Sequence, residues 1–336
     1  MIEQQKTIFE EDKQFSWHNY NESQTKEKAL FVNILNDLCE LVEEQPHNEV
    51  GRKPAKTKDV IFALIMKEYL NTSSRRVQSD LKLFIEAGFI DSAIPFNTLL
   101  DHMERKELRD ILRELIEISS LPLKQIELDF AIDSTGFATS RYETYFSFKY
   151  KKQSRWRDFR KCHAVCGVKT NIITSVDITE GYANDQTKFI PLAEDTSRNF
   201  KIREFSADKG YLSAKNYNLI QQLGGQAFIP FKKNATGKAR TCGVRKDVYR
   251  NAFLFFKKHK EEFLNKYHKR SNIESCFSVI KRKFGNNVKC KKETSQDNEI
   301  LAKVLAHNIC ILIQELFLNN INLDFNFHAE HYVARN

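Results

Sequence analysis

The chain has 336 residues, of which 41% are hydrophobic, and its 26 Phe residues exclude an intrinsically disordered protein. The formal net charge of +9 favours a polyanionic partner, nucleic acid before membrane. The sequence contains no run of about 18 apolar residues, so we expect no transmembrane helix. Its N-terminal stretch lacks the apolar segment of a signal peptide, and seven Cys without a paired spacing predict a reducing cytoplasm.

The first third of the sequence has a helical pattern. Residues 1–24 are polar, and we expect them to be poorly ordered. Short helices joined by tight breaks resemble a helix-turn-helix arrangement, in which Arg75 and Arg76 would contact a nucleic-acid backbone. A plain helical bundle explains the same pattern equally well. The helices are predicted over residues 26–44, 59–70, 72–87 (stopped by Gly88) and 98–119.

The pattern changes at Pro122. Apolar and polar residues then alternate from Ile126 to Asp133, which is typical of a half-buried strand. From Ile126 the predicted order is three strands, helix, strand, helix, strand and then further helices. This is the order of a ribonuclease-H-like α/β fold, a mixed sheet with flanking helices, preceded here by an all-helical region. The other strands are predicted at 163–167, 172–178, 202–207 and 226–231, with helices at 189–198, 213–223, 248–266 and 298–318.

We expect three parts in the chain. Residues 1–120 would be a helical region that binds DNA ends, and residues 121–318 a catalytic domain with a short basic insertion at about 232–250. Residues 319–336 would be a C-terminal tail.

The stretch from Tyr267 to Gly285 is predicted to be one helix. On it, one arc of roughly 60° would carry a row of polar side chains, beside an apolar stripe that packs on the core. The alternative is a solvated helix face with charge pairs four residues apart, and geometry alone does not separate the two. The polar row is Tyr267, Arg270, Glu274 and Lys281, and the stripe is Ile273, Phe277, Ile280 and Phe284.

Three acids stand at special positions of the predicted fold. Asp133 lies near the end of the first strand, Asp208 ends the fourth strand, and Glu274 lies on the late helix. Carboxylates are hard oxygen ligands that suit Mg²⁺ or Mn²⁺. Two such ions about 4 Å apart can activate a water or a 3′-hydroxyl for phosphodiester cleavage. Without metal the acids would repel one another, so we expect an open site that assembles when a cation binds.

Each acid also has a structural explanation. Asp133 and Asp208 both precede turn-forming residues, and Glu274 could pair with Arg270. Glu127 and Asp129 share a strand face with Asp133, so they remain candidates for the same role.

The spacing Tyr267-x2-Arg270-x3-Glu274-x6-Lys281 matches the Tyr-Arg-Glu-Lys signature of DDE transposases from prokaryotic insertion sequences. It resembles the branch grouped with insertion sequence four. The similarity covers roughly residues 122–313, and the segments that resemble the two Asp motifs of the family are Ile132–Phe137 and Ala207–Ser213.

The resemblance implies cut-and-paste DNA transposition that uses two Mg²⁺ ions, with Mn²⁺ as a substitute. It implies a metal-binding catalytic triad of Asp133, Asp208 and Glu274. Family members contact DNA phosphates through the signature Tyr, Arg and Lys, here Tyr267, Arg270 and Lys281. The basic residues beside these motifs, Lys209, Arg282 and Lys283, are further predicted DNA contacts.

The partners implied are double-stranded DNA, both transposon ends and target, and a second copy of the chain, since two ends must be paired. The protein would act in the cytoplasm on the nucleoid. A second basic, aromatic segment at 149–161 is a further candidate DNA contact, with a solvated surface as the alternative. Relatives that form a DNA hairpin carry a long β-rich insertion between the second Asp and the Glu, whereas the corresponding segment of this chain is short.

Two other functions fit the sequence. One is a transposase-derived DNA-binding protein that has lost its chemistry, and the other is a structure-selective nuclease with the same core.

Overall fold

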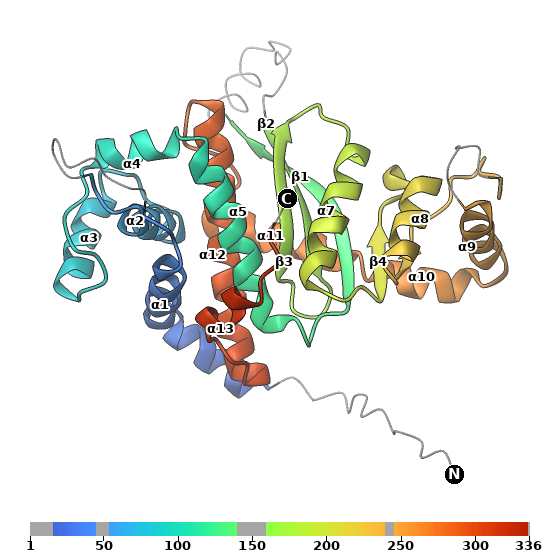
Figure 1. The fold of residues 1–336 in the computed structure, drawn as a ribbon, viewed down its shortest axis with the longest axis horizontal. Helices are drawn as coiled ribbons and strands as arrows, with labels where there is room; N and C mark the ends of the chain where they lie inside the picture. Colours follow the sequence, from blue (N-terminus) through green and yellow to red (C-terminus); the bar gives the residue numbers. More distant parts are fainter. Residues whose placement is uncertain (1–15, 45–53, 140–158, 239–244, 335–336) are drawn as a thin grey trace, which may run out of the picture.

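The computed structural model describes residues 16–44, 54–139, 159–238 and 245–334 of the chain. Within these ranges it has an N-terminal group of helices and a mixed five-stranded sheet with helices on both faces (Figure 1). The order of strands and helices from β1 onward is the ribonuclease-H-like order that the sequence predicts, so the predicted fold class is confirmed.

The strands of the sheet are arranged in the order β3-β2-β1-β4-β5. β1 pairs antiparallel with β2, and β2 pairs antiparallel with β3. β4 runs parallel to β1, and β5 runs parallel to β4. The strands are β1 (Asp129–Ala138), β2 (Phe159–Gly167), β3 (Ile173–Glu180), β4 (Glu204–Ala207) and β5 (Gln226–Phe228).

Each face of the sheet has its own hydrophobic cluster. Ala131 and Phe137 of β1 belong to one cluster, whereas Phe130 and Ile132 belong to the other, because successive residues of a strand face opposite sides. Asp133 therefore lies on the same face as Ala131. That face is covered by α5 (Glu107–Ser120), α11 (Ser271–Phe284) and α12 (Glu293–Asn319), and the other by α7 (Gln186–Asn199) and α8 (Ala214–Gln222).

The first helix begins earlier than the sequence predicts. α1 starts at Trp17, where the Ser16 hydroxyl accepts a hydrogen bond from the Asn19 N–H (3.3 Å). The expectation of poor order is therefore wrong from residue 17 onward. The reason is tertiary packing: α1 lies along α12, and the Asn19 amide donates to the carbonyl of Phe317 (2.9 Å).

The other N-terminal helices follow the prediction more closely. A residue with positive φ, Gly88 (φ 82°), ends α3 as expected. The helix expected at 98–119 is two helices, broken at residues 104–106. The helices are α1 (Trp17–Glu40), α2 (Thr57–Tyr69), α3 (Val77–Glu86), α4 (Phe96–Met103) and α5.

The helix predicted after the short insertion is also two helices. α9 (Lys246–Lys258) and α10 (Lys260–His268) meet at His259, whose backbone leaves the helical region (φ −123°, ψ 52°). α9 begins inside the segment at 232–250 that is predicted to be a short basic insertion. In the C-terminal segment, a short helix, α13 (Phe325–Glu330), follows α12.

The long helix α12 is the centre of the packing. It contacts α1, α2 and α5 as well as the sheet, so the helical region and the sheet share one continuous hydrophobic cluster (Figure 1). By length and composition α12 could span a membrane, but 78% of its most apolar window is buried inside the protein. A buried core helix accounts for that pattern. The predicted division at residue 120 stays a prediction.

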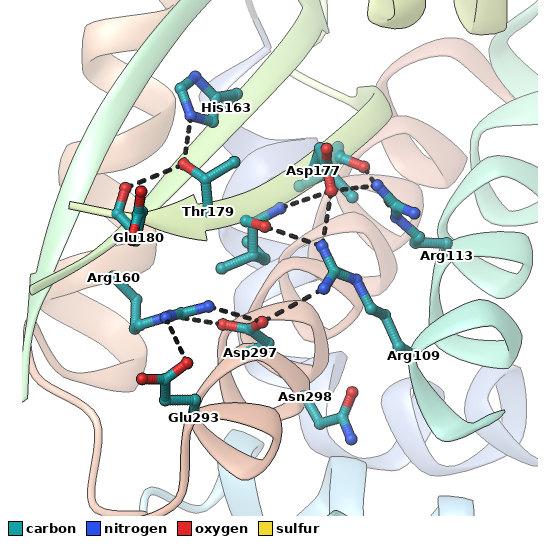
Figure 2. A network of polar contacts seen from close by, with 12 residues as sticks. Arg109, Arg113, Arg160, His163, Asp177, Thr179, Glu180, Glu293, Asp297 and Asn298 are labelled. Carbon is teal, nitrogen blue, oxygen red and sulfur yellow. Dashed lines mark hydrogen bonds and ion pairs between the residues drawn. The ribbon is translucent and has the colours of Figure 1, made fainter. Parts of the chain in front are cut away.

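Ion pairs tie the start of α12 to α5 and to the sheet, as Figure 2 shows. Arg109 of α5 donates to Asp177 of β3 (2.7 Å) and to Asp297 of α12 (3.3 Å). Arg160 of β2 forms two hydrogen bonds with the same Asp297 carboxylate (2.7 and 2.9 Å). Such two-point Arg–carboxylate contacts fix relative orientation, so the network sets how α12 crosses the sheet.

A second ion pair, further along α12, is completely buried. The Lys303 ammonium lies 3.1 Å from the Glu299 carboxylate and donates to the carbonyl of Asn287 (2.8 Å). Both side chains are 0% exposed. Asn287 also forms a β-bridge with Ala138, the last residue of β1, so this pair supports the end of the strand that carries Asp133.

Lys303→Met should lower the free energy of unfolding by about 3–5 kcal/mol, because it leaves the Glu299 carboxylate buried with too little positive charge. Lys292→Met is the matched control. Lys292 pairs with Glu104 at the surface, where the two side chains are 69% and 40% exposed, and its loss should change stability by about 0–1 kcal/mol. Urea unfolding of both variants measures the difference. Equal losses of stability in the two variants would show that the buried pair contributes no more than the surface pair.

Candidate active site

The register of two strands positions the two aspartates. β1 pairs with β4 from Asp129 as far as Ile132, which lies opposite Ala207. β4 ends there, so Asp133 and Asp208 are the next residues of two adjacent parallel strands. The sequence predicts Asp133 near the end of its strand, and this is wrong. β1 continues to Ala138 because its pairing with β2 continues.

Asp208 directly follows β4, as predicted. Its carboxylate accepts a hydrogen bond from the Gly210 N–H (3.4 Å) and so begins a short 3₁₀ turn, η2 (Lys209–Tyr211). The Gln186 amide, at the start of α7, donates to the carbonyl of Gly210 (3.0 Å). The loop that carries Asp208 is thus attached to α7, and Lys209 within it is exposed.

The signature stretch is not one continuous helix. Tyr267 belongs to the end of α10, and Arg270 immediately precedes α11. The Arg270 N–H donates to the carbonyl of Tyr267 (2.9 Å), three residues back, which is a tighter turn than an α-helix makes. The prediction of a single helix is therefore wrong at this point, although the turn still keeps Tyr267 and Arg270 close together.

The apolar stripe of α11 is buried as predicted. Fully burying side chains of this size is worth roughly 1.5–3 kcal/mol each, so the stripe determines where the helix sits on the sheet. Glu274 lies beside this stripe and is exposed. The stripe residues are Ile273, Phe277, Ile280 and Phe284.

Arg270 connects two of the three acids. One terminal nitrogen, Nη1, donates to Oδ2 of Asp133 (2.5 Å), and the other, Nη2, donates to Oε1 of Glu274. Burial raises the pKa of Asp133, and the nearby Glu274 charge adds to this, while the Ser134 N–H and Arg270 act in the opposite direction. Burial is the dominant cause, so the Asp133 carboxylate carries its charge at a cost that Arg270 only partly offsets.

The remaining signature residues surround this contact. Burial raises the pKa of Tyr267, and the charges of Asp208 and Glu274 raise it further, whereas Arg270 lowers it. Tyr267 therefore lies near Arg270 and near two acids of the predicted triad. Lys281 donates to the hydroxyl of Thr135 (2.7 Å), two residues beyond Asp133 on β1.

Two predicted basic contacts lie elsewhere. Lys283 forms an ion pair with Glu27 of α1 (2.5 Å) and lies near the ring of Tyr69, so it holds α11 against the N-terminal helices instead of facing the acids. Arg160, from the second basic segment, is committed to Asp297. Residues 149–158 of that segment lie outside the described residues. Arg282 is exposed, as a DNA contact requires.

The two additional acids on the first strand have structural partners. Asp129 pairs with Arg203 (2.8 Å) and with Lys269 (2.7 Å). Glu127 is buried and accepts a hydrogen bond from the hydroxyl of Thr170 (2.7 Å). Both are therefore part of the scaffold.

Sequence reasoning missed Asp185. Its carboxylate accepts a hydrogen bond from the Ser134 hydroxyl (2.9 Å) and pairs with Lys161 (2.7 Å). Ser134 is adjacent to Asp133 but faces the other side of the sheet. No motif in the sequence marks this contact, because it joins residues 51 positions apart.

The donor set suits a divalent metal, but the acids are not gathered around one point. Among the residues described, no three His, Cys, Asp or Glu side chains form a group that could hold a metal ion. Asp133 and Glu274 nevertheless share a single cation, the Arg270 guanidinium, and Asp208 follows the adjacent strand. Hard carboxylate oxygens around a site that already holds positive charge fit Mg²⁺ or Mn²⁺.

Comparison with known families identifies the fold. The family model described as "Transposase DDE domain" matches residues 124–309, more than half of the chain. The chain belongs to the DDE transposase family. The matched region begins just before β1 and ends within α12, so it contains all five strands of the sheet and all three acids of the predicted triad.

One curated relative of this transposase is described as a probable transposase for insertion sequence element ISA1214, from Archaeoglobus fulgidus. The two sequences are 23% identical over 262 residues, which cover 77% of this chain and 76% of the relative. No solved structure matches the transposase.

Asp133→Asn should stabilise the metal-free transposase at neutral pH. Burial raises the pKa of Asp133 in the folded protein, so stability falls as the pH rises from the ordinary carboxyl value through the folded value. The neutral amide removes this penalty. Thermal unfolding should show the variant melting above the wild type at neutral pH, with the difference vanishing in acid. A less stable variant at neutral pH would mean that the ion pair with Arg270 outweighs burial.

Proposed function

We propose that this transposase mobilises an insertion sequence and belongs to the Tyr-Arg-Glu-Lys branch. It would bind terminal inverted repeats and catalyse divalent-metal-dependent strand cleavage and strand transfer by a cut-and-paste route. The observation that carries the proposal is the contact of Arg270 with both Asp133 and Glu274, next to the strand end that bears Asp208. Residues far apart in the sequence thereby lie together at one edge of the sheet, which supports their assignment to one site.

In this proposal Asp133, Asp208 and Glu274 hold two Mg²⁺ ions, which Mn²⁺ can replace. Bound there, the metal supplies Lewis-acid activation of the attacking hydroxyl and charge stabilisation at the leaving oxygen. The protein's own task is to bring the scissile phosphate to the edge of β1 and β4. Tyr267, Arg270 and Lys281 surround that edge and would bind the flanking phosphates.

Selection of the element's ends is assigned to the N-terminal helices. Arg75 and Arg76 are exposed just before α3, and Arg75 stacks over the ring of Phe96, at the start of α4 (4.7 Å). A guanidinium held on an aromatic ring is preorganised for phosphate contact. Two copies of the chain would pair the two ends of the element, in the cytoplasm and on nucleoid DNA. The division into an end-binding region at 1–120, a catalytic domain at 121–318 and a tail belongs to the same proposal.

Glu274→Gln and Asp208→Asn should each abolish cleavage while leaving DNA binding within about threefold of the wild type, since each changes a metal ligand and preserves shape. The substrate is a labelled duplex with the DNA that flanks the gene, incubated with Mg²⁺ or Mn²⁺. The product to detect is a new 3′-hydroxyl at the element boundary. Cleavage that persists in both variants would refute the triad.

The same assay separates the other two functions. Tight binding to the flanking repeat without cleavage in either metal would identify a retired DNA-binding descendant. Metal-dependent cleavage of branched DNA, with no preference for the repeat, would identify a structure-selective nuclease.

Arg282→Ala and Lys283→Ala form a matched pair that tests which cation of the basic run contacts DNA. Arg282 is exposed, so its loss should weaken DNA binding at low salt and reduce the slope of log K against log salt by about 1. Lys283 is paired with Glu27, so its loss should lower thermal stability and leave the slope unchanged. Equal slopes in the two variants would refute this assignment.

A further inference from the structure

Arg270 occupies the position between two acids that the proposed function assigns to metal binding. Its side chain is 17% exposed, and each of its terminal nitrogens is bonded to a different carboxylate. The planar guanidinium thus neutralises one acid from β1 and one from α11 at the same time. The proposed function requires these acids to bind Mg²⁺ and Arg270 to bind a DNA phosphate, and the present contacts exclude both.

We propose that Arg270 is a displaceable counter-cation that leaves Asp133 and Glu274 when DNA arrives, so that DNA binding prepares the site for the divalent metal. This inference rests on the proposed function and adds to it the order in which DNA and metal bind. Away from DNA the acids hold Arg270 and bind metal weakly. On DNA the guanidinium transfers to a phosphate, and the acids are left for the metal.

The contact of Arg270 with Glu274 is weak enough to permit this exchange. Glu274 is 55% exposed, and ion pairs in that setting are worth about 0–1 kcal/mol. The position of α11 depends instead on its buried apolar stripe. Arg270 can therefore release the acids without displacing the helix that carries Glu274.

Departure of Arg270 also raises the affinity of the acids for a divalent metal. Asp133 is only partly buried, with its side chain 21% exposed, and among the described residues its polar partner besides Arg270 is the Ser134 N–H (2.9 Å). Without the guanidinium its charge would face Glu274, with Asp208 at the adjacent strand end. Carboxylates crowded in this way repel one another, and a divalent cation relieves the repulsion. A phosphate accepts the same two-point contact from Arg270 that the carboxylates give up.

The linkage between the two ligands is reciprocal. If a DNA phosphate raises the affinity for metal, metal must raise the affinity for DNA by the same factor. The consequence for the cell is a transposase whose nuclease centre stays unloaded until it is on DNA.

Arg270→Gln should bind Mn²⁺ about tenfold more tightly than the wild type in the absence of DNA, a change of about 1.4 kcal/mol. Free Mn²⁺ is measured by electron paramagnetic resonance during titration. Lys281→Gln is the control, because it removes one positive charge from the same signature but breaks a bond to Thr135, not to an acid. The double variant Asp133→Asn with Arg270→Gln should lose the added affinity.

A second arm measures the linkage itself. Adding a short duplex should raise the Mn²⁺ affinity of the wild type toward that of Arg270→Gln. The Mn²⁺ affinity of Arg270→Gln should not change once the Mn²⁺ bound by the duplex itself has been subtracted. Thermal unfolding checks that the variants are folded, and Mn²⁺ should raise the melting temperature of Arg270→Gln more than that of the wild type.

The outcomes separate this inference from the proposed function. Equal Mn²⁺ affinities of Arg270→Gln and Lys281→Gln would overturn the counter-cation, even if the wild type cleaves the repeat. Failure of the folded wild type both to bind Mn²⁺ on DNA and to cleave would overturn the proposed function as well.

Discussion

The parallel pairing of β1 with β4 is the constraint on which the site depends. The pairing stops at Ile132 and Ala207, so the next residue of each strand, Asp133 and Asp208, leaves the ladder at the same level. β1 remains extended beyond this point because β2 continues to pair with it on the other side. Among the described residues, β1 therefore has no strand partner on this edge from Asp133 to Phe137, and α11 packs against it.

Much of this arrangement could be predicted because it follows from local pattern. Alternation of polar and apolar residues located the strands, and the apolar stripe located the buried face of α11. The break between α10 and α11 could not be predicted, because neither Gly nor Pro marks it. Lys269 and Arg270 keep helical backbone angles (φ −55° and −56°), and only the hydrogen bonding shifts to a tighter turn. This is also why Tyr267 and Arg270 stay close despite the break.

The partners of individual charges were beyond sequence reasoning. Arg282 and Lys283 are neighbours in one basic run, but one faces solvent and the other pairs with Glu27, 256 positions away. Arg160 looked like part of a DNA-binding patch and instead holds the start of α12. A run of like charges specifies a basic segment, whereas the packing of remote helices decides which of its members stay exposed.

The interactions that hold the scaffold are stronger than those within the proposed site. Burial of apolar side chains and the enclosed Lys303–Glu299 pair hold the sheet, α11 and α12, and these contacts are expensive to break. The contacts of Arg270 are different in kind, since one of its carboxylates is mostly exposed and the other is destabilised by burial. A site that must exchange one cation for another needs weak contacts within it and strong contacts around it. That contrast, more than the presence of three acids, distinguishes this edge of the sheet from the ion pairs of Asp129 and Asp297, which bind their partners within the scaffold.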